Sequence, residues 1–372
     1  MNVAWRNLTR DRGRVLVSAG GVGFAVLLIL LLRSLYAGIL DSSTRFVRGV
    51  EDHSDESVVW VAQKGTPGDF FHSVSLMPEE RREEIQAVRG VVAAVPLLGR
   101  ATEFTYRDHE ADFFVLGVDP EAPIAAPATV ERGARAPAEG EVILSRVVAD
   151  DLGIGMGDTL DVAGLPLRVA GVTPEGAGFL SQFAWVHYDD AERLLQVEGV
   201  VNFFLVLAEG DATTVADRIE TEVPGTLSMT TDEFADENTR DMEEGVLPIV
   251  YVLMFIGLAI GTLIIGLTVY AATMERRREY GVMKAIGFNN RKLITVVWQQ
   301  AIAAGAIGFV VGVAATVALA ALVARIEPLF TTTFTAYDVA FVAVAALVMS
   351  LLASLVPIRP VMRTDPAEVF RG

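Results

Sequence analysis

Four long apolar stretches divide the chain, and polar segments of very different lengths separate them. The first lies between Arg14 and Arg33, and the others cover residues 246–274, 293–324 and 339–358. A helix needs about 20 apolar residues to cross the hydrocarbon core of a bilayer. The pattern predicts four transmembrane helices. The first extends over residues 15–40 and is expected to remain as an anchor, because no convincing signal-peptide cleavage site follows it.

The short connecting segments predict the orientation of these helices. Four arginines lie in residues 1–14, six basic residues in 275–292 and three in 359–372, whereas residues 325–338 contain only Arg325. Basic connections remain on the cytoplasmic side. We therefore expect a multi-pass protein of the inner (cytoplasmic) cell membrane with both termini in the cytoplasm. Residues 1–14 fit either an amphipathic helix on the lipid surface or a plain tail.

The long segment between the first two spans is acidic. Residues 41–245 contain 15 basic and 40 acidic residues, a net charge of −25, and the rest of the chain carries +8. Nucleic acid requires a basic surface, so this segment is not expected to bind it. Short alternating runs, among them residues 91–98 and 101–106 as separate strands, predict an α+β extracytoplasmic domain. Helical spacing at both flanks predicts that spans one and two continue outward as stalks.

The sequence offers little catalytic chemistry. Cysteine is absent, and the four histidines are widely separated. None of the three lysines follows a glycine, so the sequence contains no Walker A loop. We expect no enzyme activity and no metal or cofactor in this chain. GxxxG spacings at Gly257/Gly261 and Gly308/Gly312 predict close helix packing.

The basic segment between spans two and three nevertheless contains apolar residues. Tyr280 to Ile286 can form about two helical turns that end at Gly287, and Asn289 or Asn290 can cap the next helix. Tyr280, Met283 and Ile286 fall on one apolar face at helical spacing. This face could dock into a groove of a cytoplasmic protein. Alternatively, the segment is a basic re-entry loop whose apolar residues rest on lipid headgroups.

A family resemblance favours docking. The segment resembles the coupling-helix pattern E-[YIL]-G-x-x-[KR]-A-[ILMV]-G of MacB/FtsX-type ABC permeases, through Glu279, Tyr280, Gly281, Lys284, Ala285, Ile286 and Gly287. NVAWRNLTRDRGR, FFVLGVDP, EVILSRVVADDLGIGMGDTLDV and PIRPVMRTDPAEVFRG resemble other segments of the family, in order along nearly the whole chain. The chain also resembles the DevC-like branch, whose members carry no fused ATPase.

The resemblance implies a polytopic α-helical membrane protein with a MacB periplasmic-core domain between helices 1 and 2. It implies two permease copies, identical or similar, two separate ATPase subunits that bind ATP and Mg, and a possible outer adaptor or hydrolase. It also implies that these residues couple the permease to the ATPase: Glu279, Tyr280, Gly281, Met283, Lys284, Ala285, Ile286 and Gly287.

In such permeases ATP-driven movement passes through rigid spans to the outer domains. The second span is expected to transmit this movement. The expectation treats the span as a helix without an internal proline, since sharp kinks usually arise at proline. The leading function is export or extraction of a hydrophobic, amphipathic or peptide-like substrate. The alternative is an FtsX-like transmitter that controls a cell-wall hydrolase without transport. A third possibility is a membrane-anchored receptor or enzyme that works without an ATPase.

Overall fold

The computed structural model describes residues 12–51, 54, 56–66, 70, 75–106, 109–174, 182–326 and 334–363. It divides into two compact units. The helical unit comprises Met1–Ala37, Val246–Glu327 and Thr332–Gly372, and the sheet unit comprises Gly38–Gly245 and Pro328–Thr331. Most of the expected amphipathic segment (residues 1–14), half of the outer loop (325–338) and most of the tail (359–372) lie outside the described residues.

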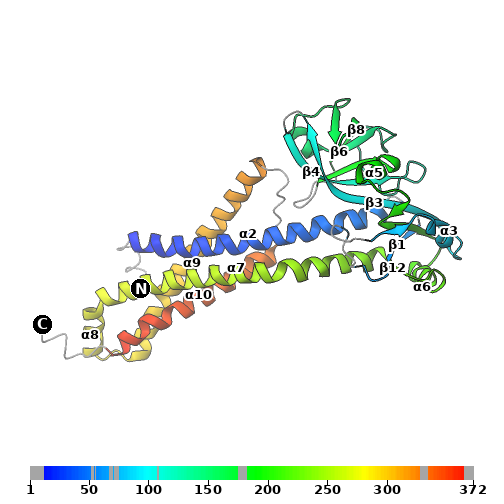
Figure 1. The fold of residues 1–372 in the computed structure, drawn as a ribbon. Helices are drawn as coiled ribbons and strands as arrows, with labels where there is room; N and C mark the ends of the chain where they lie inside the picture. Colours follow the sequence, from blue (N-terminus) through cyan, green and yellow to red (C-terminus); the bar gives the residue numbers. More distant parts are fainter. Residues whose placement is uncertain are drawn as a thin grey trace. The chain divides into compact units, whose positions relative to one another are not determined.

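The helical unit is built from all or part of four long helices and one short helix (Figure 1). They are α2 (Arg12–Glu51), α7 (Thr231–Glu275), α8 (Arg277–Ala285), α9 (Asn290–Ile326) and α10 (Ala336–Arg363). Within the described residues, four stretches are long and apolar enough to span a membrane, namely Ala19–Gly38, Leu247–Glu275, Asn290–Val323 and Ala336–Met362. This arrangement, with an α+β domain between the first two spans, confirms the predicted fold class.

The GxxxG glycines lie where neighbouring helices of this unit come close together. A Cβ atom on Gly308 would lie 2.4 Å from the Cβ of Val22 in α2, and one on Gly257 would lie 3.2 Å from a Leu28 methyl group. A Cβ on Gly261 would lie 2.6 Å from the sulfur of Met349 in α10. A Cβ does not fit at Gly308 or Gly261 unless neighbouring atoms shift, and at Gly257 the Leu28 side chain would have to move slightly, so these glycines allow the helix backbones to pack together.

Helix α7 differs from the predicted proline-free span. Pro248 lies inside it. Proline has no N–H to donate to the preceding turn, and its ring crowds that turn. The expectation of an uninterrupted hydrogen-bond ladder is therefore wrong at this position. Beyond the apolar segments, α2 continues to Glu51 and α7 begins at Thr231.

The sheet unit is built on one large mixed sheet. Its strands run in the spatial order β12 (Thr226–Thr230), β1 (Ser57–Gln63), β11 (Phe203–Ala208), β3 (Val91–Tyr106), β4 (His109–Val118), β9 (Gln182–His187), β6 (Glu141–Ser145), β8 (Leu165–Thr173) and β5 (Arg132–Gly133). Strand β7 (Thr159–Val162) pairs with β3 and β8, and β2 (Met77–Pro78) pairs with β10 (Val200–Val201). The short helices are α3 (Arg81–Gln86), α4 (Arg146–Asp151), α5 (Tyr188–Leu195) and α6 (Ala212–Glu222).

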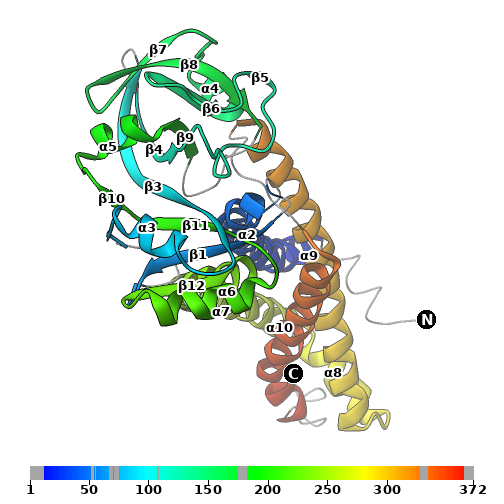
Figure 2. The same ribbon diagram turned by 90° about the vertical axis from the view of Figure 1, so that its right-hand side faces the viewer.

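Strand β3 replaces the two separate strands expected between residues 91 and 106 (Figure 2). Its first half pairs with β11 and its second half with β4. Gly99, which lies between the two expected strands, pairs with Leu116 inside the ladder. A glycine can remain within a strand when neighbouring side chains approach closely, and a Cβ here would lie 2.8 Å from the Phe114 ring.

Alternation along the strands divides the core of the sheet unit into two clusters. Val59 and Val61 of β1 enter a mainly aliphatic cluster that also receives residues of α3, α4, α5 and α6. Trp60, between them, enters an aromatic cluster on the opposite face. There its ring stacks on Phe234 of α7, with centroids 4.6 Å apart. Val47 of α2 is buried in the same cluster.

Candidate functional site: the short helix α8

Two local breaks define α8. Arg276 separates it from α7 with φ −97° and ψ 12°, so α7 ends at Glu275. At the other end Gly287 has φ +95°. The Gly287 N–H donates to the Lys284 carbonyl at 3.0 Å, and the Phe288 N–H donates to the Met283 carbonyl at 2.9 Å. These are the two bonds of a Schellman motif, which confirms the predicted helix end.

The next helix begins at once. The Asn289 carbonyl accepts hydrogen bonds from the N–H groups of Lys292 and Leu293, at 2.9 and 3.3 Å. Asn289 therefore stands immediately before the first turn of α9, one of the two positions expected for the cap. Short connections at both ends hold α8 between α7 and α9.

The eight predicted coupling residues do not share one environment. Tyr280 and Gly281 are buried in the helical unit, and Met283 and Lys284 are half-buried. The other four are exposed: Glu279, Ala285, Ile286 and Gly287. The single apolar face expected through Tyr280, Met283 and Ile286 is therefore wrong, because the helical unit itself covers the first of these residues and part of the second.

Tyr280 is tied to two neighbouring helices. It is 2% exposed and belongs to the core of the helical unit with Leu293 and Val297 of α9. Its hydroxyl group hydrogen-bonds with the side chains of Gln300 in α9 and Thr273 in α7. Burial raises the pKa of Tyr280, an effect that these hydrogen bonds partly oppose. The phenol is therefore neutral at physiological pH.

A different set of apolar side chains faces outward. Ile286 is 71% exposed, Val282 is 43% exposed and Phe288, just after the helix, is 39% exposed. We call these three residues the α8 apolar surface. Basic residues accompany it, and the ammonium group of Lys292 lies 5.5 Å from the centre of the Phe288 ring. Val282 and Ile286 are four residues apart, a spacing from which this face could have been assigned.

Lys284 adds a tie to the last helix. Its Nζ donates a hydrogen bond to the Met362 carbonyl oxygen near the end of α10, at 2.8 Å. Together with the contacts of Tyr280, this bond connects α8 to α7, α9 and α10. None of these groups forms a nucleophile–base pair; the arrangement can bind and position a partner.

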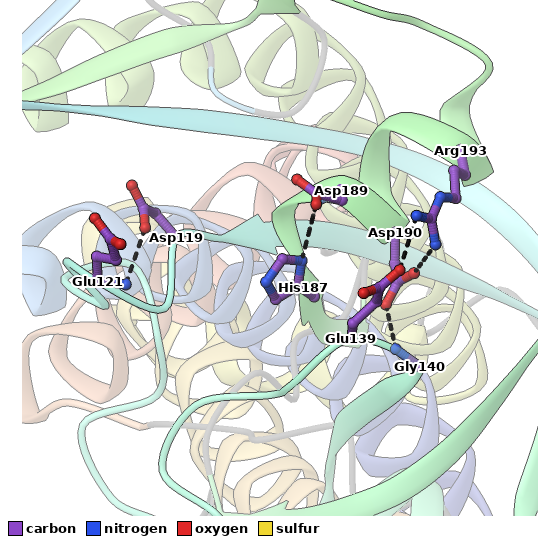
Figure 3. Close-up of polar contacts among 8 residues, drawn as sticks. All are labelled: Asp119, Glu121, Glu139, Gly140, His187, Asp189, Asp190 and Arg193. Carbon is purple, nitrogen blue, oxygen red and sulfur yellow. Dashed lines mark hydrogen bonds and ion pairs between the residues drawn. The ribbon is translucent and has the colours of Figure 1, made fainter.

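Several polar groups near α5 in the sheet unit have structural partners instead (Figure 3). Asp190 is 1% exposed and accepts hydrogen bonds from the Gly140 N–H at 2.6 Å and from Arg193 at 3.2 Å. His187 caps α5 by accepting from the Asp189 N–H at 3.2 Å. Within the described residues, no three His, Cys, Asp or Glu side chains are arranged to hold a metal ion.

Comparisons with known proteins identify the family. Residues 15–222, more than half of the chain, match the MacB-like periplasmic core domain, and residues 251–366 match the FtsX-like permease C-terminal region. An uncharacterized ABC transporter permease of Mycobacterium bovis is 27% identical over all of this chain and 98% of its own length. The macrolide export ATP-binding/permease protein MacB of Bradyrhizobium diazoefficiens is 22% identical over 74% of this chain and 46% of its own length.

Two solved structures also resemble the chain. The extracellular domain of the transporter YknZ from Gram-positive bacteria covers 46% of this chain and 99% of its own, with 14% identity and a TM-score of 0.37. The periplasmic region of MacB from Actinobacillus actinomycetemcomitans covers 50% of this chain and 92% of its own, with 11% identity and a TM-score of 0.39. The two family matches account for nearly the whole chain, which belongs to the MacB/FtsX-type permeases of ABC transporters.

Proposed function

We propose that this permease converts ATP hydrolysis by a separate ATPase subunit into movement of its extracytoplasmic domain. That movement exports or extracts a hydrophobic, amphipathic or peptide-like substrate. In this proposal the protein lies in the cytoplasmic membrane with both termini and α8 inside. Two permease copies assemble with two ATPase subunits, which bind ATP and Mg. An adaptor or hydrolase outside the membrane is an optional further partner.

The observation that carries this proposal is the α8 apolar surface. Val282 and Ile286 are four residues apart on one helix, as anchors of a helix that docks in a groove are. Both residues are exposed. The basic residues of this segment support its location on the cytoplasmic side of the membrane. The matching partner surface is an apolar groove with acidic residues at its rim.

The absence of a Walker A loop supports an ATPase on a separate subunit. No lysine in the sequence follows a glycine, so these 372 residues do not contain that phosphate-binding loop. The MacB relative is named as an ATP-binding/permease protein, which supports ATP as the energy source of this family. Helix α7 carries Phe234 in the aromatic cluster at one end and Thr273 near α8 at the other, so a single element is available to transmit motion.

The test is co-purification of the permease with its ATPase. Ile286→Glu places a charge at the centre of the α8 apolar surface. It should weaken ATPase binding by about 30-fold or more, the size of a hot-spot effect of roughly 2 kcal/mol. Val92→Glu makes the same kind of change at an exposed residue of the sheet unit and serves as the control. Binding of Ile286→Glu at the level of the control would refute the docking role of α8.

A second measurement separates export from signal transmission. The permease–ATPase complex is reconstituted in vesicles and supplied with ATP and candidate amphipathic substrates. ATP-dependent transfer of a substrate supports the exporter. ATP-dependent activation of a bound cell-wall hydrolase without transfer supports the FtsX-like alternative.

A further inference from the structure

Tyr280 and the α8 apolar surface lie on different sides of α8. Ile286 is 71% exposed, whereas Tyr280 is 2% exposed and packed in the helical unit. A docked partner therefore contacts one side of this helix, and the other helices of the permease contact the opposite side. A force on α8 leaves it through the short connections to α7 and α9 and through the contacts on the buried side. The structure of those contacts determines which helices receive the force.

The hydrogen bonds around Tyr280 connect three helices. Thr273 donates its hydroxyl proton to the Val269 carbonyl at 2.7 Å, so its oxygen is left as an acceptor. The Tyr280 hydroxyl group hydrogen-bonds with the Thr273 hydroxyl group and with the side chain of Gln300. The three side chains form one chain of hydrogen bonds from α9 through α8 to α7.

All three members of this chain are shielded from water. Thr273 is 1% exposed, Tyr280 is 2% exposed and Gln300 is 9% exposed. A polar group that loses its partner here cannot replace it with solvent, so separating the helices carries the full desolvation cost. Apolar packing alone allows helices to slide. This chain of hydrogen bonds therefore resists independent movement of α8 relative to α7 and α9 more strongly than apolar packing does.

We propose that Tyr280 is a positioning residue that transmits motion of α8 to α7 and α9 through its hydroxyl group, and takes no part in docking the ATPase. This inference rests on the proposed function, because it presupposes that an ATPase moves α8. It divides α8 into a docking side at Ile286 and a transmitting side at Tyr280. Lys284 extends the transmitting side to α10 through the Met362 carbonyl.

The discriminating variant is Tyr280→Phe, which keeps the ring and its packing and removes only the hydroxyl group. The sequence contains no cysteine, so labels can be attached selectively at introduced cysteines. The full permease–ATPase complex is labelled at exposed Met156→Cys in the sheet unit and exposed Val344→Cys in α10. Co-purification reports ATPase binding, and spin-label distances with and without ATP report motion of the outer domain.

Tyr280→Phe should bind the ATPase as the wild type does. The ATP-induced population of the shifted distance should fall about five-fold, the effect of one buried hydrogen bond. Thr273→Val should have the same effect, and the double variant should be no worse than either single one, because both changes break the same chain. Thr268→Val is the matched control. Thr268 also donates to its own helix, at 2.7 Å to the Ile264 carbonyl, but it does not belong to the hydrogen-bond chain of Tyr280.

Three outcomes would overturn the inference. Loss of ATPase binding in Tyr280→Phe would make Tyr280 part of the docking side. An unchanged ATP response in both Tyr280→Phe and Thr273→Val would show that packing alone transmits the motion. Additive effects would show that the two hydroxyl groups act independently. If Tyr280→Phe does not fold, Thr273→Val and Gln300→Met provide the same test. Failure of the wild type to bind any ATPase would instead refute the proposed function.

Discussion

Replacing Gly312 with alanine tests how closely α9 and α2 have to approach. A Cβ on Gly312 would lie 2.6 Å from the Cβ of Val26 and 2.7 Å from the Gly23 carbonyl oxygen. Carbon atoms in ordinary contact are about 3.5–4.0 Å apart, so the two helices must separate by roughly 1 Å. Forcing one extra group into such a contact costs about 1–3 kcal/mol. The backbone oxygen cannot rotate away as a side chain can, so a cost in the upper half of this range is expected.

The control has to remove the effect of alanine on helix propensity. Alanine stabilises a helix interior by about 1 kcal/mol relative to glycine wherever it fits. Gly20 lies in α2, and a Cβ there would have no heavy atom within 4 Å. Gly20→Ala therefore gains the propensity without the clash, and the difference between the two variants isolates the clash.

The assay is unfolding in mixed micelles with increasing denaturing detergent, followed by helical circular dichroism. We expect the free energy of unfolding of Gly312→Ala to be lower than that of Gly20→Ala by about 1–3 kcal/mol. If Gly312→Ala is as stable as Gly20→Ala, the close approach of α2 and α9 is not required for stability. The packing argument from the glycine positions would then be wrong.

Two further changes probe single interactions. Arg33 of α2 donates from Nε to Asp338 Oδ1 of α10 at 2.7 Å and also lies 4.6 Å from the centre of the Phe341 ring. Asp338→Asn should lower the unfolding free energy in micelles by roughly 1.5–3 kcal/mol, the value of a charged hydrogen bond; no change would mean that this contact contributes nothing. In the sheet unit, burial and then the nearby Glu192 raise the pKa of Glu79 above its ordinary 4.5. The folded state therefore holds this proton more tightly than the unfolded chain, and the resulting stabilisation is lost as the pH rises through the folded pKa. Glu79→Gln should gain thermal stability relative to the wild type between about pH 4 and pH 7, and a constant difference would contradict this.

Signals that act between neighbours in the sequence predicted much of this protein. Apolar length predicted four helices able to cross a membrane, and the structure contains them. Gly287 predicted the end of α8, because only a residue that tolerates positive φ closes a helix with the Schellman bonds observed there. The ordered motifs predicted the family, which the comparisons show over nearly the whole chain. Each of these depends on residues that are close in the sequence.

Tertiary structure decided what covers each surface. The spacing of Tyr280, Met283 and Ile286 identified apolar positions on α8, but it could not show that α7 and α9 bury the first and leave the last exposed. The sequence likewise predicted two strands, 91–98 and 101–106, and β3 continues through Gly99 between them because β4 supplies a partner from another part of the chain. The sequence thus determined which elements form and where they end. Burial is a property of contacts between elements, and it determined which side of α8 can face a partner and which side can transmit its motion.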